Sequence, residues 1–205
     1  MIRNRNVDPR SAIRTQNAVT WRVPLITVAR QTYYASAVSI TAAASGTAIT
    51  LLQNFSPTVQ SIFVAIGGTF GATSFNVTLV GENQFGETVT ENIAFTATGN
   101  TQSLYCYRKL TSATINNVVG TIGAATISIG HDPTQGVSRV PLLAKLAGSA
   151  SVLNAYVETL APAGPTFTVT LAPYYTLNLT GVTLSGGSQN LKVDLITSPT
   201  VDPIV

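Results

Sequence analysis

The chain has 205 residues, of which 45% are hydrophobic and only 9% are charged, and its net charge is +3. This length allows one domain or two small ones, and the charged fraction lies far below the roughly 25% of a typical soluble domain. A single cysteine, Cys106, excludes an intrachain disulfide. No apolar run approaches the roughly 20 residues that span a membrane, so we expect no membrane segment. So little charge favours a protein whose surface is largely covered by neighbours.

Residues 1–35 are expected to form an extended N-terminal arm, because two prolines interrupt them and their apolar residues lack a helical period. The first 30 residues hold six arginines against one aspartate, whereas the rest of the chain holds five basic and seven acidic residues. The loose spacing of the arginines, with a single early tryptophan among them, argues against nucleic acid as the partner. We expect the arm to pack along a body, either its own or a neighbour's, with its arginines either paired with an acidic partner protein or solvated. The candidate partner-binding residues are Arg3, Arg5, Arg10, Arg14, Trp21 and Leu25.

Residues 36–130 are expected to form a β-sandwich or barrel domain. Phe75, Val77 and Leu79 alternate with polar residues, and a similar alternation follows over residues 89–95. The short Gly- and Asn-bearing loop between these two runs predicts an antiparallel hairpin. The runs at 104–109, 112–118 and 125–130 predict three further strands. Short strands separated by turns at this spacing are typical of a sandwich or barrel.

Residues 131–205 are expected to form a second β lobe or to continue the sandwich. The segment after His131 is polar and carries a proline and a glycine, which indicates a boundary. Residues 139–148 predict either a helical turn or two, or an extended apolar connection. Alternation then returns over 152–158, 166–171 and 191–195. The fold class is therefore all-β, with an antiparallel sandwich or jelly-roll-like body in one or two lobes.

The chain offers little for catalysis or metal binding. His131 is the only histidine and is expected in a loop, with Asp132 pointing another way, so a hydrolase triad is not predicted. One histidine and one cysteine cannot supply a zinc site. Glu87 and Glu91 share a strand face and could form a glycosidase pair, but we favour two rim charges on the wet side of the hairpin. We expect no enzyme, no cofactor and no metal.

Two tyrosine pairs could serve as interface aromatics. Tyr33 with Tyr34, and Tyr174 with Tyr175, would make good contacts if exposed. The alternative interpretation is that one ring of a pair is buried while the other lies along the surface.

The stretch 59–130 resembles proteins of tailed-bacteriophage virions. The resemblance rests on the strand that ends at Thr78 to Gly81, the polar loop Asn83 to Gly86, the strand opening Glu87 to Glu91 and the run Lys109 to Ile115. It covers about a third of the chain and is one of manner rather than of a strict motif. It implies a small β-sandwich or jelly-roll virion piece, a decoration (cement) protein that binds the major capsid protein outside the shell, often as a homotrimer. Such a protein is assembled in the host cytoplasm and ends on the capsid surface.

Two alternatives remain open. A ring of copies could join parts of the neck or tail, which is also a structural role. A host- or glycan-binding β-sandwich could instead use Tyr174 and Tyr175 on an exposed face.

Overall fold

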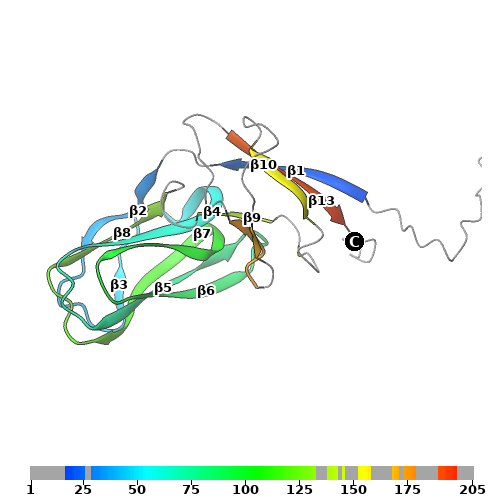
Figure 1. Cartoon of the computed structure of the whole chain (residues 1–205). Helices are drawn as coiled ribbons and strands as arrows, with labels where there is room; N and C mark the ends of the chain where they lie inside the picture. The colour runs from blue at the N-terminus through cyan, green and yellow to red at the C-terminus, as the bar shows by residue number, and fades with distance from the viewer. Residues whose placement is uncertain are drawn as a thin grey trace, which may run out of the picture.

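The structure is a computed structural model of the whole chain, and it describes residues 17–25, 29–132, 138–142, 145, 152–157, 168–170, 173–178 and 189–197. Within residues 17–25, 152–157, 168–169 and 189–197 only the backbone is described. The regular elements of these described residues are all β-strands (Figure 1). The all-β fold class expected from the sequence is thereby confirmed.

The strands form three antiparallel sheets. A seven-stranded sheet has the order β2-β8-β4-β7-β5-β6, with β3 paired to β7, and two three-stranded sheets have the orders β1-β13-β10 and β11-β12-β9. The strand bounds are β1 Asn17–Leu25, β2 Arg30–Ser39, β3 Thr47–Ile49, β4 Phe55–Gly68, β5 Ser74–Asn83, β6 Thr88–Phe95, β7 Gly99–Val119, β8 Ala125–His131, β9 Arg139–Pro141, β10 Val152–Val157, β11 Thr168–Thr170, β12 Thr176–Asn178 and β13 Gln189–Thr197.

The hairpin of β5 and β6 follows directly from its sequence. Alternate residues of β5 are buried, among them Phe75, Val77 and Leu79, because the side-chain period of a strand is two. β6 pairs with β5 without a register shift over eight residues. In the connecting turn, the Asn83 side-chain Oδ1 accepts the backbone N–H groups of Phe85 (2.9 Å) and Glu87 (3.0 Å). The predicted antiparallel hairpin is confirmed.

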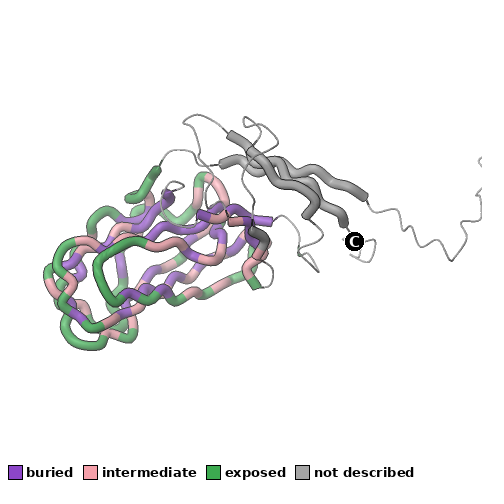
Figure 2. Tube along the Cα trace, viewed as in Figure 1, coloured by how far each residue is buried: buried purple, intermediate pink, exposed green. Residues whose placement is uncertain are grey.

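β7 is one strand of 21 residues, where the sequence pattern predicted two shorter ones. Its first part pairs with β4, and its second part pairs with β5 on one side and with β3 on the other. Register shifts in both long pairings let the strand bend. β7 therefore belongs to both layers of the sandwich, and the core lies between those layers (Figure 2).

The sandwich core is apolar and draws on both layers. Its largest fully buried side chains include Ile62 from β4, Phe75 and Leu79 from β5, Ile115 from β7 and Ile127 from β8. Phe75 stacks between Phe70 and Phe95, at centroid distances of 5.2 and 5.8 Å.

The outer face of β4 and β7 is covered as well. Five consecutive residues of β4, from Gln60 to Val64, are buried, which shows that both faces of this strand are covered. β9 lies against β4 and β7: the Arg139 N–H donates to Ser61 Oγ (2.9 Å) and the Cys106 thiol donates to the Arg139 carbonyl (3.4 Å). Of the two possibilities left open for residues 139–148, the described part is extended at 139–141, and most of the remainder lies outside the described residues.

The first and last strands among the described residues pair with each other. β1 and β13 are antiparallel neighbours along all nine residues, from Asn17 opposite Thr197 to Leu25 opposite Gln189. Residues 17–25 of the predicted arm are thus a sheet strand. The domain boundaries at 35 and 130 stay predictions, although the first falls within β2 and the second one residue before the end of β8.

Candidate interaction site

Four aromatic residues from distant parts of the chain meet beside the β5–β6 turn. The ring of Tyr174 packs edge-on against Tyr105 with centroids 4.7 Å apart, and Tyr175 packs edge-on against Phe85 at 5.8 Å. All four side chains are half-buried. The Gln84 side-chain N–H donates to the carbonyls of Tyr174 (3.1 Å) and Tyr175 (2.9 Å). We call Phe85, Tyr105, Tyr174 and Tyr175 the aromatic cluster.

Charged side chains lie near the aromatic cluster. Lys145 Nζ lies 5.3 Å from the centroid of the Phe85 ring and forms an ion pair with Glu87. Arg108 donates to Glu82 from Nε (2.9 Å) and Nη2 (2.6 Å). These hydrogen bonds lower the pKa of both glutamates. Because the pairs are exposed, each contributes little to stability, and the result is an aromatic surface with a mixed-charge rim.

Sequence reasoning found half of this cluster. Tyr174 and Tyr175 were predicted as possible interface aromatics and do lie at the surface, whereas Phe85 and Tyr105 were missed. The available signal was an aromatic side chain, Phe85, inside an otherwise polar turn. Tyr105 gave no such signal, because an aromatic residue in a strand is ordinary.

Glu91 is not the solvent-facing rim charge that the sequence suggested. Its carboxylate accepts the backbone N–H groups of Leu104 (2.7 Å) and Tyr105 (3.2 Å) in β7. Burial raises the pKa of Glu91, and these two hydrogen bonds oppose the rise. Glu87 instead lies exposed in the turn, paired with Lys145. The two carboxylates therefore have different partners and different burial, and they are not the two equivalent rim charges that the sequence suggested.

His131 is a buried strand residue, not the loop residue that was expected. It ends β8 and is 1% exposed. Its Nδ1 lies 3.2 Å from the Ser61 carbonyl, which can only accept, so Nδ1 carries the proton. Nε2 therefore accepts from the Tyr34 hydroxyl at 3.1 Å. Burial lowers the pKa of His131 to about 4, so the ring is neutral.

A serine lies beside the same ring, which raises the question of a nucleophile. Ser56 Oγ is 3.2 Å from His131 Nε2, a spacing found in nucleophile–base pairs. However, the Ser56 hydroxyl donates to the Thr58 carbonyl, and the imidazole is out of reach of a substrate. The contacts of His131 are those of a buried hydrogen-bond network that joins β2, β4 and β8.

The first tyrosine pair follows the alternative interpretation. Tyr34 is fully buried in the core, where its ring packs beside His131. It therefore cannot contact a partner protein. Tyr33 is half-buried and packs edge-on against Tyr34 at 5.0 Å.

Most of the predicted arm residues lie outside the part of the chain that the structure describes. Arg3, Arg5, Arg10 and Arg14 lie outside the described residues. Trp21 and Leu25 belong to β1, opposite Val193 and Gln189 of β13, and their side chains are not described.

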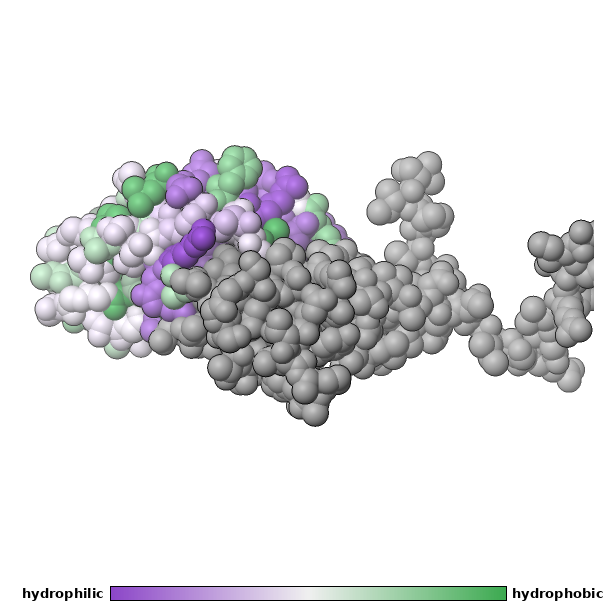
Figure 3. Space-filling model, turned by 90° about the horizontal axis from the view of Figure 1, so that it is seen from above, coloured by the Kyte–Doolittle hydropathy of each residue, from purple (hydrophilic) through white to green (hydrophobic). Residues whose placement is uncertain are grey.

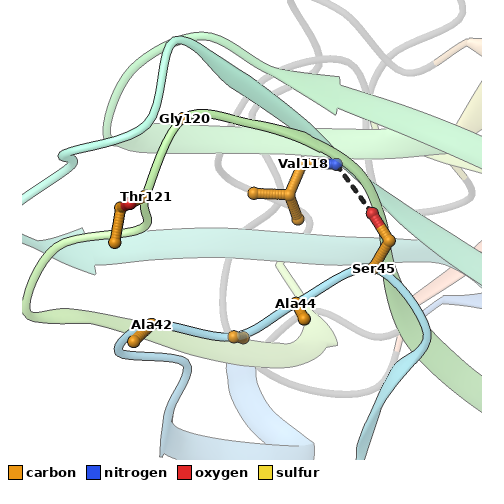
Figure 4. Close-up of a pocket in the computed structure, with 7 residues that line it drawn as sticks. Ala42, Ala44, Ser45, Val118, Gly120 and Thr121 are labelled. Carbon is orange, nitrogen blue, oxygen red and sulfur yellow. Dashed lines mark hydrogen bonds between the residues drawn. The ribbon is translucent and has the colours of Figure 1, made fainter.

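One pocket lies at the end of the sandwich where the β2–β3 and β7–β8 loops meet (Figure 4). Its volume is about 260 Å³, and it is lined by small residues such as Ala42, Ala44, Gly120 and Thr121. The Val118 N–H donates to Ser45 Oγ (3.0 Å) across it. None of its lining residues is ionisable.

The rest of the described surface carries few reactive side chains and few large exposed apolar ones. On the face in Figure 3, hydrophobic residues form small, separate patches. The large exposed apolar residues among those described are Leu52, Phe55 and Val119, and Phe55 lies under Lys109 (5.6 Å from Nζ to the ring centroid). Cys106 is buried, and burial raises the pKa of its thiol. Within the described part, no group of three His, Cys, Asp or Glu side chains could hold a metal ion.

Comparison with known proteins returns no relative: no family model, no curated protein and no solved structure matches this chain. The described residues include no helix that is long and apolar enough to cross a membrane.

Proposed function

We propose that this chain is a structural protein of a tailed-phage virion, a decoration (cement) protein that binds and stabilises the head shell. The proposal combines the resemblance of residues 59–130 with the physical character of the chain. An all-β body with 9% charged residues suits a molecule surrounded by neighbours. The partners would be the major capsid protein and further copies of this chain, with the homotrimer as the assembly that the resemblance implies.

The observation that carries the proposal is the placement of the basic segment. Residues 1–16 hold four arginines and one aspartate, and they precede β1, which pairs along its whole length with β13. A charged segment attached to a folded sheet can bind an acidic groove on a neighbour while the body makes a second contact. Such linkage raises the effective concentration of each contact for the other.

The aromatic cluster is a candidate for the second contact. Half-buried tyrosines present a large area at a low entropy cost, and their hydroxyls can still bond to a partner. A charged rim around them, with Arg108 and Lys145 opposite Glu82 and Glu87, is common at protein interfaces.

The structure sharpens the deletion that tests the arm. Removing residues 1–30 would also delete β1 and leave β13 without one neighbour, so a deletion of residues 1–16 is cleaner. We expect this deletion to abolish binding to purified heads, with an unchanged circular dichroism spectrum. Full binding by the truncated protein would refute the role of the arm.

Substitution separates the effect of the arm's charge on head binding from the effect of its length. Changing Arg3, Arg5, Arg10 and Arg14 together to Gln should weaken head binding by roughly 1–4 kcal/mol, at about 0.2–1 kcal/mol for each exposed pair. The matched control changes the same four residues to Lys, which keeps the charge. Equal loss in both variants would show that charge does not carry the contact.

Copy number in intact particles separates the head from the neck or tail. A number comparable with that of the shell protein, measured by quantitative mass spectrometry, supports a lattice-wide decoration role. A small fraction of that number supports the neck or tail, and absence from particles would overturn a virion role.

The second candidate, glycan binding, is favoured by the aromatic cluster alone. Rings at a rim of charged and amide groups can stack on a sugar face, and Tyr174 is the ring that would do so. Binding on a glycan panel should be lost in Tyr174→Ala and kept in Phe55→Ala, an exposed aromatic outside the cluster. A panel without any binding removes this candidate.

A further inference from the structure

β6 is an edge strand of the seven-stranded sheet. It pairs with β5 on one side, and in the part of the chain that the structure describes no strand pairs with its other side. Figure 1 shows β6 and the first half of β7 bordering one side of the sandwich. An edge of this kind carries N–H and C=O groups that can pair with another chain.

The hydrogen-bond pattern shows which residues present those groups. The Asn83 N–H donates to the Glu87 carbonyl (3.0 Å), so residues 83 and 87 face each other as a bonded pair. Bonded pairs alternate in an antiparallel ladder, and the β5–β6 register is regular. The backbone groups of Thr88, Thr90, Asn92 and Ala94 therefore point away from β5, and all four residues are exposed.

β6 has few of the features by which proteins protect their edges. Its sequence, TVTENIAF, contains no lysine, arginine or proline, and its pairing has no bulge. Its one charged residue, Glu91, points inward, which is one such feature, but its carboxylate is already bound by two backbone N–H groups of β7.

Most of the other strand edges differ. β2, at the opposite end of the sheet, has two register irregularities, and its Tyr34 carbonyl accepts the Leu52 N–H (2.7 Å). β1 contains Arg22 and Pro24, β10 has a register shift, and β3, β9 and β11 are three residues long. Each of these features discourages strand addition.

We infer that β6 pairs antiparallel with β6 of a second copy of this chain, with Asn92 opposite Asn92 across a two-fold axis. In this register Thr90 faces Ala94 of the second copy, and the outward backbone groups form bonded pairs. Among the inward-facing residues, Val89 then lies opposite Phe95, and Glu91 lies opposite Ile93.

The choice of a second copy rests on self-complementarity. A register shifted by one residue on each strand, with residue 91 at the centre, would place Glu91 opposite Glu91, and like charges directly opposite are unfavourable. The register centred on Asn92 avoids this contact and places the apolar side chains of Val89 and Phe95 opposite each other. Val89 packs against the core but is only half-buried in one chain, so the pairing would cover it.

The contact is small, so the dimer should be weak. One strand edge buries less than the roughly 1,200 Å² of a standard interface. We therefore expect reversible dimerisation in the micromolar to millimolar range, which sedimentation velocity over concentrations up to about 1 mM would detect. The contact does not depend on whether the basic segment binds a shell.

Thr90→Pro tests the edge directly. Proline removes the outward N–H without removing a bond to β5, and it is tolerated on edge strands. We expect the full chain to give a mass rising from one to two monomers with concentration, and Thr90→Pro to stay monomeric with wild-type thermal stability. A wild-type chain that remains a monomer at about 1 mM, or that forms a trimer without a dimer, overturns the inference.

A charge swap tests the register and does not depend on proline being accommodated. Asn92→Lys and Asn92→Glu should each weaken dimerisation by about threefold, because each places like charges opposite each other. An equal mixture of the two should recover it. Thr121→Lys, on the exposed β7–β8 loop, is the matched control and should change nothing. Weakening in both single variants without recovery in the mixture refutes this register, and a dimer unaffected by either variant refutes the β6 contact.

Discussion

Acidification should destabilise this protein through His131. The imidazole is 1% exposed and neutral, with Nδ1–H donated to Ser61 and Nε2 accepting from Tyr34. Protonation would place a second N–H against the Tyr34 hydroxyl and a positive charge in the interior, where Arg30 also disfavours it. The unfolded chain has no such restriction, so it takes up the proton first.

The size of the effect follows from the two pKa values. The pKa of His131 is about 4 in the fold and 6.5 when unperturbed. A folded-state pKa below the unfolded value means that the group costs stability as pH falls from about 6.5 toward 4. The cost is about 2 kcal/mol at pH 5 and approaches about 3 kcal/mol near pH 4.

Urea unfolding at pH 7, 6 and 5, followed by far-UV circular dichroism, measures this loss. This pH window lies above the pKa range of most carboxylates. That matters because protonation of the different glutamates would change the stability of the fold in opposite directions. The raised pKa of Glu91 makes that group favour the fold as pH falls, whereas the lowered pKa values of Glu82 and Glu87 do the reverse. The quantity to compare is therefore the wild-type loss minus the loss in His131→Gln.

His131→Gln should be less stable at pH 7 by roughly 1–3 kcal/mol, since it disturbs a buried hydrogen-bond network. Its further loss between pH 7 and pH 5 should be smaller than that of the wild type by about 2 kcal/mol. Parallel losses in the two proteins would show that His131 is not buried as a neutral ring.

Three further predictions concern stability and reactivity. Gly81→Ala should cost roughly 1–3 kcal/mol of unfolding free energy, because the added Cβ would collide with the β7 backbone. Gly67→Ala should cost less, since its Cβ would meet only a threonine hydroxyl at 3.3 Å. Equal urea midpoints for the two variants would contradict this prediction. Glu91→Ala should cost roughly 2–5 kcal/mol, since two backbone N–H groups of β7 lose their acceptor, while Glu87→Ala should cost under about 1 kcal/mol; chemical denaturation of the pair decides. Cys106 should not react with a thiol reagent in the native protein and should react fully in urea. Rapid labelling of the native protein would show that β9, which contacts Cys106, opens.

Local patterns were enough to predict the elements but not their long-range relations. The β5–β6 hairpin was predictable because strand alternation and a turn built on Asn83 lie within one short stretch. β7 was expected as two strands, since its alternation shifts along the run and bulges are set by the strands beside it. The boundary predicted after residue 35 falls within β2, whose pairing with β8 is a long-range relation that local patterns do not reveal.

The site shows the same division. Tyr174 and Tyr175 could be picked out as a pair, but their packing on Tyr105 and Phe85 depends on contacts across 69 and 90 residues of chain. Spacing alone placed Glu87 and Glu91 in equivalent positions. In the structure Glu87 lies in the turn and pairs with Lys145, whereas two backbone N–H groups of β7 bind the carboxylate of Glu91.

The position of β7 in both layers has a consequence for how the chain folds. Neither layer can complete its hydrogen bonds until residues 99–119 are available. The first part of this strand is the pairing partner of β4, and the second part is the pairing partner of β3 and β5. Such long-range pairings make folding slow. During synthesis the first 98 residues would have no finished sheet to join, so the sandwich should form in one late, cooperative step. Protease protection of nascent chains should therefore rise abruptly once β7 and β8 have left the ribosome.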